Sequence, residues 1–541
     1  MVFKKRITAL LTIVLITSFS IKTLYGVEAE HMALMQQLQQ EEPELFERVE
    51  LVTENKRDLL KVTLSDVLLM VLKRSNTIEA QRLGETAAQS GVEASKAIYQ
   101  TSLETSATQS KTAGLSSTDL DDNDDPTTSY LATTSTDATA LSATVSKKTS
   151  LGITFSSTLS SSKSQTDSYS MAEKGDDLSK SSTGEEVDSS SLSATVSIPL
   201  FQDWGDVNDL PVKRSQILLD QAKATTYSTG VGLLESVANE YWNLVGVQEN
   251  IKTLKEAVNL SEKLVRETRA RVQVGVLNPT DLKETQTQLA NNRKDLLTKQ
   301  IEEQETEDKI RVALDLGTIP FGFKPADLPR IHGEDFNFQE LLNKAYENST
   351  DLKTLMISLK SNQYDLDDAY NSDKTDLDLS LTYTLNGYGD SPSETTQYYS
   401  NDEYQGYSAT LTWNVPLFDD SASETIMQRK IERSKLELQI RDAKAEIYVS
   451  LQTILRNLKF GIEEEKAAQL SVNLAKDLLD KEVEKLKIGK STSYNVSQAQ
   501  KNYTDAKLGE TLVRVGNERN FVKLLVLTGD IFSYYKLPKS L

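Results

Sequence analysis

The spacing of apolar residues between Tyr241 and Leu316 constrains the fold of this chain more than any other feature of its sequence. From Leu244 onwards, apolar or small residues recur at alternating intervals of three and four, which is a 3.5-residue repeat typical of helices that pack side by side. The repeat predicts one long helix that ends at Gly275. Its seam consists of Leu244, Val247, Ile251, Leu254, Val258, Ser261, Val265, Thr268 and Val272.

A second helix begins shortly after Gly275 and returns along the first. Thr280 is a candidate N-cap for it, but the preceding Pro279 leaves the identity of the capping residue open. Gly317 and Pro320 end the return helix. Its spaced apolar residues are Leu282, Leu289, Leu296, Ile301 and Ile310. The stretch therefore predicts a long α-helical hairpin with a sharp tip.

The chain contains a second copy of this plan, in nearly constant register with the first. The matched segments are Ile198–Asp203 with Val415–Asp420, Val274-Gly275 with Ile488-Gly489, Asp281-Leu282 with Asn495-Val496, and Gln286 with Gln500. Because the separation between matched positions hardly changes along the chain, we interpret the two halves as an internal duplication.

Each half also contains a region of predicted strands, at about residues 101–199 and 376–416. Apolar residues alternate there with Ser and Thr, which predicts strands with one apolar and one hydroxyl-rich face. The clearest runs are Leu141–Val145, Leu151–Phe155, Leu192–Ile198, Leu377–Leu385 and Tyr407–Val415. Such strands suit a barrel with lipid outside and water inside, although a soluble sheet with one wet face has the same alternation.

Three other segments lack this alternation. Residues 119–125 and 160–190 are acidic or rich in serine, and we expect them to form long loops that face solvent. Residues 28–61 are polar, and we expect them to be weakly helical. The first half also has room for two more strands than the second, at Leu141–Val145 and Leu151–Leu159. These strands either widen a barrel or form a hairpin outside the membrane, and the sequence leaves both possibilities open.

Composition excludes several classes of function. The net charge of −20 and the presence of only two histidines argue against a nucleic-acid partner. The absence of cysteine excludes disulfides, thiolate metal sites, a cysteine nucleophile and an N-terminal lipidated cysteine. Glycine-rich phosphate loops are also absent, and His332 is isolated in a Pro/Gly-bounded linker. We therefore expect no enzymatic activity, no cofactor, and no catalytic or metal-binding residue.

The N-terminus predicts export. Lys4–Arg6 supplies a positive region, Ile7–Ile21 an apolar core, and cleavage is expected near Gly26 or Ala29. A membrane anchor is the alternative, but Thr and Ser interrupt the apolar run, which is shorter than the roughly 18 residues of a spanning helix. Since no other segment has the apolar character of a spanning helix, an exported chain that crosses a membrane must do so with strands. Four to six strands per chain are too few for a water-filled barrel, so an oligomer must complete it.

Taken together, these motifs resemble the TolC-like outer-membrane efflux protein family over about residues 62–530. The resemblance implies a mainly α-helical fold in which a trimeric outer-membrane β-barrel continues into a long periplasmic α-helical barrel. It implies the exit duct of a tripartite efflux pump or type I secretion system, with passive, porin-like transport in a Gram-negative-type envelope. The implied partners are two further copies of the chain, outer-membrane lipid, a periplasmic adaptor (membrane fusion protein) and, through it, an inner-membrane transporter.

The resemblance also implies a division of the chain. Its parts are a signal peptide (1–26), an N-terminal periplasmic segment (27–61), a first efflux repeat (62–317), a linker (318–335), a second repeat (336–530) and a C-terminal tail (531–541). The alternative to a channel is a non-channel coiled-coil or adhesive surface protein.

Two sets of residues carry over from the family by position. Adaptor docking is expected at the hairpin tips, at Val274, Gly275, Asp281, Leu282, Ile488, Gly489, Asn495 and Val496. The strand-to-helix junctions are expected at Pro199, Leu200, Phe201, Pro416, Leu417 and Phe418. The alternative for the tips is purely structural: the glycines shape the turns and Asp281 caps a helix. Asn495 departs from the acidic residue common in the family, which argues against two equivalent tips.

Overall fold

The computed structural model describes residues 50–54, 57–118, 130–174, 177–316, 322–333, 336–400, 402–415, 417 and 420–538. The predicted signal peptide, most of segment 27–61, the acidic stretch 119–125, Pro416 and Phe418 lie outside these residues. The chain forms two compact units. The first comprises Met1–Arg82, Thr225–Thr350 and Ala443–Leu541, and the second Leu83–Ala224 and Asp351–Asp442.

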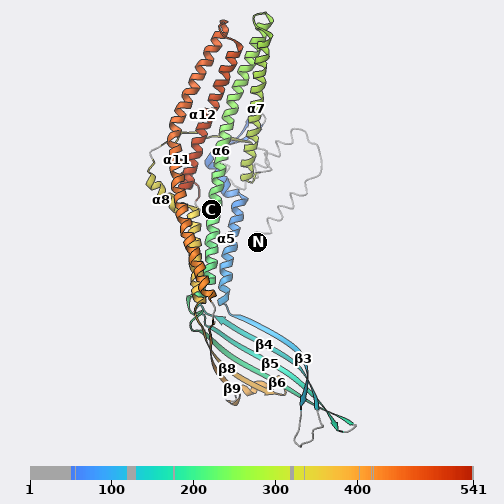
Figure 1. Cartoon of the computed structure of the whole chain (residues 1–541). Coiled ribbons are helices and arrows are strands. Elements are labelled where there is room, and N and C mark those ends of the chain that lie inside the picture. Colours follow the sequence, from blue (N-terminus) through green and yellow to red (C-terminus); the bar gives the residue numbers. More distant parts are fainter. Residues whose placement is uncertain are drawn as a thin grey trace. The chain divides into compact units, whose positions relative to one another are not determined.

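The first unit contains the tips of the two predicted hairpins (Figure 1). Helix α6 (Leu210–Gln273) turns back into α7 (Pro279–Ala313), and α11 (Ser421–Lys487) turns back into α12 (Ser493–Thr528). The 3.5-residue seam is confirmed, because all its members from Leu244 to Thr268 are buried and Val272 is half-buried. None of the described helices combines the length and the apolar character that crossing a bilayer requires.

A buried polar layer crosses this helical packing. The Gln500 side-chain amide donates to the Ala257 carbonyl oxygen at 2.6 Å and to the Ser261 hydroxyl at 2.8 Å. Asn292 of α7 donates to the same hydroxyl at 2.7 Å. A shift of one helix along another would leave these buried polar groups without hydrogen bonds. The layer therefore fixes the register of α6, α7 and α12.

Two pairs of consecutive helices complete the duplicated plan. In the first half these are α4 (Leu64–Arg74) and α5 (Asn76–Lys96), followed by a short 3-10 turn, η1 (Ala97–Tyr99). In the second half they are α8 (Phe338–Asn348) and α9 (Thr350–Ser372). Both pairs break at a serine, Ser75 or Ser349, in extended conformation. A last short helix, α13 (Ile531–Tyr534), lies near the C-terminus.

A small sheet in the first unit corrects one prediction. Where helix was expected, the described residues form strands β1 (Glu50–Glu54) and β2 (Arg57–Val62), and β2 pairs in parallel with β7 (Gly322–Pro325) from the predicted linker. Leu60, Val62 and Phe323 are buried. The local pattern did not reveal these strands, because the second partner of β2, β7, lies far away in the sequence.

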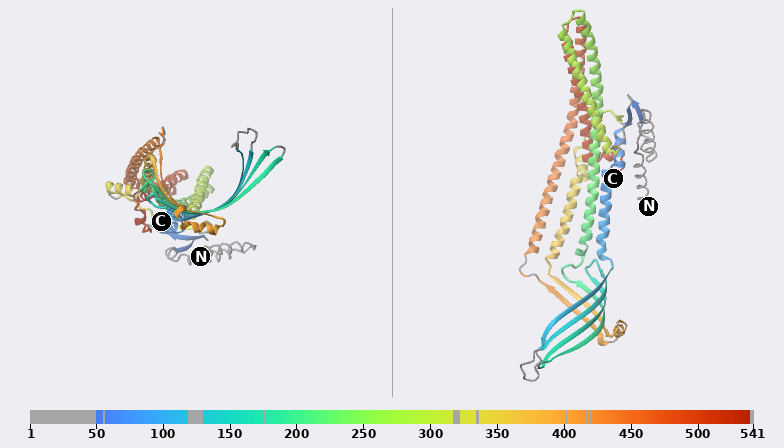
Figure 2. Two further views of the ribbon diagram at one scale, coloured as in Figure 1. Left: turned by 90° about the horizontal axis from the view of Figure 1, so that it is seen from below. Right: turned by 90° about the vertical axis from the view of Figure 1, so that its right-hand side faces the viewer.

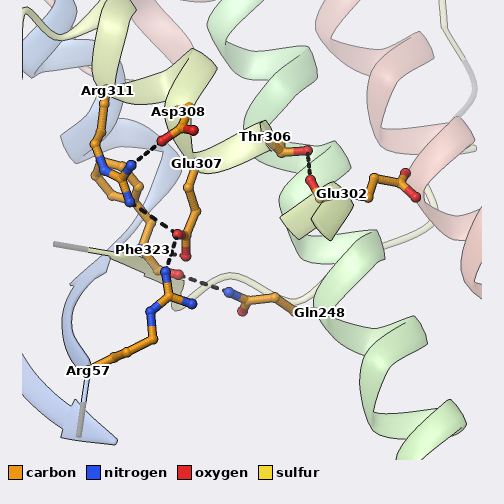
Figure 3. Close-up of polar contacts among 8 residues, drawn as sticks. All are labelled: Arg57, Gln248, Glu302, Thr306, Glu307, Asp308, Arg311 and Phe323. Atoms are coloured by element: carbon orange, nitrogen blue, oxygen red, sulfur yellow. Dashed lines mark hydrogen bonds and ion pairs between the residues drawn. The ribbon is translucent and has the colours of Figure 1, made fainter. Parts of the chain in front are cut away.

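A buried carboxylate holds this sheet against α7 (Figure 3). The Glu307 side chain is fully buried and forms ion pairs with Arg57 at 2.9 Å and Arg311 at 3.2 Å. It also accepts a hydrogen bond from the Phe323 backbone N–H at 3.2 Å. On the other side, Gln248 of α6 donates to the Phe323 carbonyl oxygen at 2.9 Å. A Cβ at Gly322 would lie 2.8 Å from a Glu307 carboxylate oxygen and 2.5 Å from the end of the Leu59 side chain, so a larger residue would displace these two side chains.

Replacing Glu307 with alanine should destabilise the first unit. The Phe323 N–H would lose this acceptor and Arg57 this carboxylate, while Arg311 would keep Asp308, and leaving buried polar groups unsatisfied costs about 1–3 kcal/mol of unfolding free energy. Glu307→Gln should cost less, because an amide oxygen can still accept from the Phe323 N–H. Guanidinium-induced unfolding of the detergent-solubilised protein, followed by circular dichroism, measures both variants. Equal stability of Glu307→Ala and the native chain would contradict this role.

The same carboxylate should also make stability depend on pH. Burial raises the pKa of Glu307 above its ordinary value, although Arg57 opposes the shift. The folded chain therefore binds a proton more readily than the unfolded chain, so this contribution to the unfolding free energy falls as pH rises from the ordinary glutamate pKa through the raised one. Glu307→Gln should remove that fall, whereas exchange of the exposed Glu305, which is on the same helix, should leave it in place.

The second unit is built on a six-stranded antiparallel sheet. Its strands are β3 (Ser102–Thr118), β4 (Tyr130–Lys148), β5 (Thr154–Lys174), β6 (Asp177–Pro199), β8 (Asp376–Gly389) and β9 (Gln405–Asn414), in the order β3-β4-β5-β6-β8-β9. They form one curved layer (Figure 2). Three short helices, α10 (Pro392–Thr395), η3 (Thr396–Ser400) and η4 (Asp402–Tyr404), connect β8 to β9.

The two faces of this sheet differ as the alternation predicts. Large apolar side chains on one face are exposed, among them Leu103, Leu141, Phe155, Leu159, Leu381 and Leu411. The opposite face carries hydroxyl pairs that hydrogen-bond across neighbouring strands. These pairs are Ser102–Ser146, Ser106–Ser142, Thr144–Thr158, Thr195–Thr382 and Ser197–Ser380.

The expectation of a long loop at residues 160–190 is wrong for the described part. Residues up to Lys174 continue β5, and residues from Asp177 continue β6. This part of the two strands has no alternation of apolar residues. Its serine hydroxyls hydrogen-bond across the strands instead, Ser160 with Ser191 and Ser162 with Ser189, each at 2.7 Å. The connection between β4 and β5 is short, since β4 ends at Lys148 and β5 begins at Thr154.

Candidate docking site at the hairpin tips

The tip of the first hairpin is a glycine turn followed by a complete capping box. Gly275 has φ 75°, a left-handed conformation that favours glycine. The N-cap of α7 is Asn278 and not Thr280: the Asn278 side chain accepts from the Thr280 N–H at 3.3 Å, and Pro279 occupies the first helical position. The Asp281 carboxylate accepts from the Asn278 N–H at 3.1 Å, so this residue has a structural function at the tip.

The tip of the second hairpin repeats the turn with different chemistry. Gly489 has φ 74°, and the Thr492 hydroxyl caps α12 by accepting from the Asn495 N–H at 3.2 Å. The turn is followed by Lys490 and Ser491, where the first tip has Val276 and Leu277. Lys485 and Ser491 donate to the Glu482 carboxylate at 2.7 and 2.5 Å, and these hydrogen bonds lower its pKa.

The structure separates the predicted tip residues into two groups. Val274 is 73% exposed and Ile488 is 69% exposed, and both glycines and Asn495 also lie at the surface. Asp281 and Leu282 are half-buried. Val496 is only 2% exposed, so it supports the tip from inside and is not available to a partner.

Contacts between the two hairpins hold their tips together. Thr268 of α6 and Ser493 of α12 are 3.0 Å apart, and Arg271 donates to the Leu486 carbonyl oxygen at 2.8 Å. Beneath them lies a buried cluster of Leu264, Leu479, Leu486, Val496 and Ala499. Sequence reasoning missed Arg271 and Ser493, because their partners come from the other repeat. The tips are therefore one connected surface and not two independent turns.

A groove lies beside this surface, between α7 and α12. It has a volume of about 320 Å³. Its lining residues are Thr280, Lys283, Glu284, Thr287, Gln288, Tyr494, Ser497 and Gln498. Tyr494 is 58% exposed, and its aromatic ring next to a glycine turn was the one sequence signal that could have identified the groove. With Val274, Val276 and Ile488 at the turns, the tips offer apolar contacts and a shallow recess to a partner.

The first predicted junction lies at the end of a strand. Pro199 is buried and ends β6, and the Leu200 N–H donates to the Leu377 carbonyl oxygen at 2.8 Å. The chain then passes through η2 (Asp206–Asp209) into α6. Leu200, Phe201 and Leu417 are exposed, as is Trp204. Pro416 and Phe418, the remaining junction residues, lie outside the described residues.

His332 has a packing contact that its sequence context did not reveal. Its ring lies 3.1 Å from the Glu518 carboxylate and stacks on Phe521 with ring centroids 3.8 Å apart. The backbone N–H of Arg330 donates to the same carboxylate at 2.7 Å. These contacts fasten the linker to α12. Within the described part of the chain, no group of three or more His, Asp or Glu side chains is placed to hold a metal ion.

Comparisons with known proteins agree with this fold. Residues 142–315 match the family model described as outer membrane efflux protein. No curated protein sequence matches the chain.

Three solved structures illustrate the shared fold. The outer membrane protein VceC from Vibrio cholerae is 12% identical, with TM-score 0.59 over 86% of this chain and 96% of VceC. The CmeC outer membrane channel of Campylobacter jejuni is 13% identical, with TM-score 0.60 over 88% of this chain and 90% of CmeC. The MtrE outer membrane channel of Neisseria gonorrhoeae is 12% identical, with TM-score 0.58 over 86% of this chain and 88% of MtrE. The family-model match and this fold confirm the resemblance to TolC-like outer-membrane efflux proteins.

Proposed function

We propose that this chain, which resembles TolC-like efflux proteins in sequence motifs and fold, is the outer-membrane exit duct of a tripartite efflux pump or type I secretion system. Three copies pool their strands into one outer-membrane β-barrel and their long helices into a periplasmic α-helical barrel. Transport is passive, and the substrate is selected by the partners. The observation that carries the proposal is the uncovered two-faced sheet, whose apolar face suits lipid and whose hydroxyl face suits a water-filled lumen.

Aromatic residues support a membrane position for this sheet. Tyr383 and Tyr407 pair across β8 and β9, and Trp413 is exposed on the same face of β9. The connection between these strands adds a cluster in which the Tyr404 ring contacts Tyr388 and Tyr398. Tyrosine and tryptophan are enriched where a barrel meets the membrane–water interface.

Exposed apolar residues on the long helices support the oligomer. In the first unit, Leu297 and Ile301 of α7 are exposed, as are Phe460, Leu470 and Leu474 of α11. Stripes of this kind on long helices mark surfaces that another helix covers. A closed ring of chains buries them, with further copies of the same chain as the partners.

The tips are the proposed contact for a periplasmic adaptor, which links the duct to an inner-membrane transporter and gates it. An adaptor's helical hairpin would rest on Val274 and Ile488 and enter the groove next to Tyr494. Gly275, Gly489, Asp281 and Asn495 shape the turns that present these contacts, and Leu282 and Val496 support them from below.

Purification and conductance test the channel. Protein from outer membranes should migrate as a detergent-stable trimer and conduct ions when inserted in planar bilayers. Mock preparations from cells that lack the gene provide the control for contaminating porins. Soluble monomers without conductance would refute the proposal and favour the non-channel coiled-coil or adhesive alternative.

A further inference from the structure

The hairpin β4–β5 is the part of the sheet that the second repeat does not have. We propose that this hairpin lies in the membrane wall, with its apolar face against lipid acyl chains, so that each chain supplies six strands to the pore. The inference rests on the proposed function, and it chooses between the two positions that the sequence leaves open. Three copies of a six-stranded sheet would make an eighteen-stranded barrel, and barrel diameter grows roughly in proportion to strand number.

The place of the hairpin in the sheet is the first argument. β4 and β5 lie between β3 and β6, and β3 pairs with β4 over its whole length. β5 pairs with β6 in the same continuous manner. If β3 and β6 are in the wall, the hairpin cannot leave it without breaking both ladders, and exposed backbone groups are not tolerated in lipid.

The chemistry of its two faces is the second argument. Cross-strand pairing aligns Ala143 with Leu159, Leu192 and Leu385, so these side chains share one face across four strands. On this face Leu141, Val145, Phe155 and Leu159 are 45–55% exposed, close to the 43% of Leu381 on β8. On the opposite face Thr144 and Thr158 are 2.9 Å apart, as Thr195 and Thr382 are at 3.0 Å. The hairpin therefore has the same lipid-compatible and water-compatible faces as β6 and β8.

The height of the apolar band is the third argument. On β8 it runs from Leu377 to Leu385, close to the roughly 9–11 residues that a strand needs to cross a bilayer. Further along the same face of the hairpin, charges begin: Lys111 of β3 pairs with Asp137 at 3.0 Å, and Lys163 pairs with Glu186 of β6. Charged pairs mark the upper boundary of lipid contact.

In the second repeat, the apolar band ends at the same height on the sheet, but there a packed segment and not a charged pair ends it. The segment α10–η3 packs against β6 and β8, where the Tyr399 hydroxyl donates to the Ser190 hydroxyl at 2.9 Å. At Gly387 a Cβ would lie 1.8 Å from the Thr395 carbonyl oxygen, so only glycine permits this approach. Ser190 is in register with Gly387 and, through Ser161, with Leu141. The apolar band thus ends along one line across β4, β5, β6 and β8.

The directions of the edge strands allow three copies of the sheet to close into one barrel. All neighbours in the sheet are antiparallel, so the two edge strands, β3 and β9, run in opposite directions. β9 of one copy can therefore pair with β3 of the next without interrupting the alternation. Among the described residues, β3 pairs only with β4 and β9 pairs only with β8, which leaves both edges uncovered in a single chain.

Because the chain contains no cysteine, single cysteines report on each face without a background reaction. The test variants on the hairpin are Val145→Cys and Leu159→Cys on the apolar face and Ser156→Cys on the hydroxyl face. The matched references on β8 are Leu381→Cys and Thr384→Cys. Each variant is reacted in outer membranes with a sulfonated, membrane-impermeant maleimide, and each must first be shown to form the same detergent-stable oligomer as the native chain.

Cysteines at positions 145 and 159 should react at least about tenfold more slowly than the cysteine at position 156, because lipid suppresses thiolate formation. The same ratio is expected between positions 381 and 384. If 145 and 159 react as fast as 156 while 381 stays protected, the hairpin lies outside the membrane and the inference is overturned, but the channel proposal stands. If 381 reacts as fast as 384, the membrane position of the whole sheet fails, and with it the proposed function.

Discussion

Replacing both tip glycines with valine, as Gly275→Val with Gly489→Val, is expected to abolish export while leaving the oligomer intact. Both residues have φ near +75°, where an L-residue is strained by about 1–2 kcal/mol and a β-branched one by more. No neighbour lies within 4 Å of a Cβ at either site, so the strain resides in the backbone. The turns must rearrange to relieve it, and Val274 and Ile488 move with them. A loss of about 1.4 kcal/mol in docking already lowers affinity tenfold.

The measurement needs no knowledge of the substrate. A deletion strain of the native host is complemented with each variant, and inhibitory concentrations are compared for compounds to which the deletion sensitises the cells. Gly275→Asn with Gly489→Asn is the first control, because asparagine tolerates the left-handed region. Gly509→Val is the second, since Gly509 lies in α12 with open space around it and adopts no positive φ. Full resistance in the double valine variant, at native protein levels, would rule out docking at the tips.

The second large effect is expected from a charge on the apolar face of the sheet. Leu381→Arg should remove the assembled protein from the outer membrane, because arginine on the lipid-facing side of a barrel costs about 2–4 kcal/mol near the bilayer midplane. Three copies would each carry this cost in the proposed trimer. Leu381 is exposed in the single chain, so no packed neighbour is disturbed in the free subunit.

Thr384→Arg provides the matched control, three residues along the same strand. Thr384 belongs to the hydroxyl face, opposite the face of Leu381. The expected result is a detergent-stable oligomer in outer-membrane fractions for Thr384→Arg and degraded or periplasmic monomer for Leu381→Arg. Equal recovery of both variants from the outer membrane would show that the apolar face does not contact lipid.

The sequence predicts those features of this fold that depend on local periodicity. The seam from Leu244 to Thr268 can be predicted because each turn of the helix places another apolar or small residue on the same buried side. The two-faced strands are readable because Leu192, Val196 and Leu381 alternate with hydroxyl residues. The duplication is readable because the turns at Gly275 and Gly489 require the same rare backbone conformation.

The features that sequence reasoning missed depend on distant partners or on weak local signals. β2 gains stability from β7, which lies in the linker between the repeats, and neither strand has a distinctive pattern. Ser160–Lys174 has no apolar alternation, so its strand is identified only through its pairing with β4 and β6. The sequence left the cap of α7 open because Asn278 and Thr280 both have capping side chains, and only the structure shows which one precedes the first helical residue.

The unlike tips have a consequence for stoichiometry. The first tip presents Val276 and Leu277 next to its glycine, while the second presents Lys490 and Ser491. A partner that requires the apolar pair finds one place per chain, so a trimer would accept three copies of it. A partner that requires only the glycine turn and the neighbouring Val274 or Ile488 finds two places per chain, and six copies could fill the ring. The number of bound partner molecules therefore reports which chemistry of the tips is recognised.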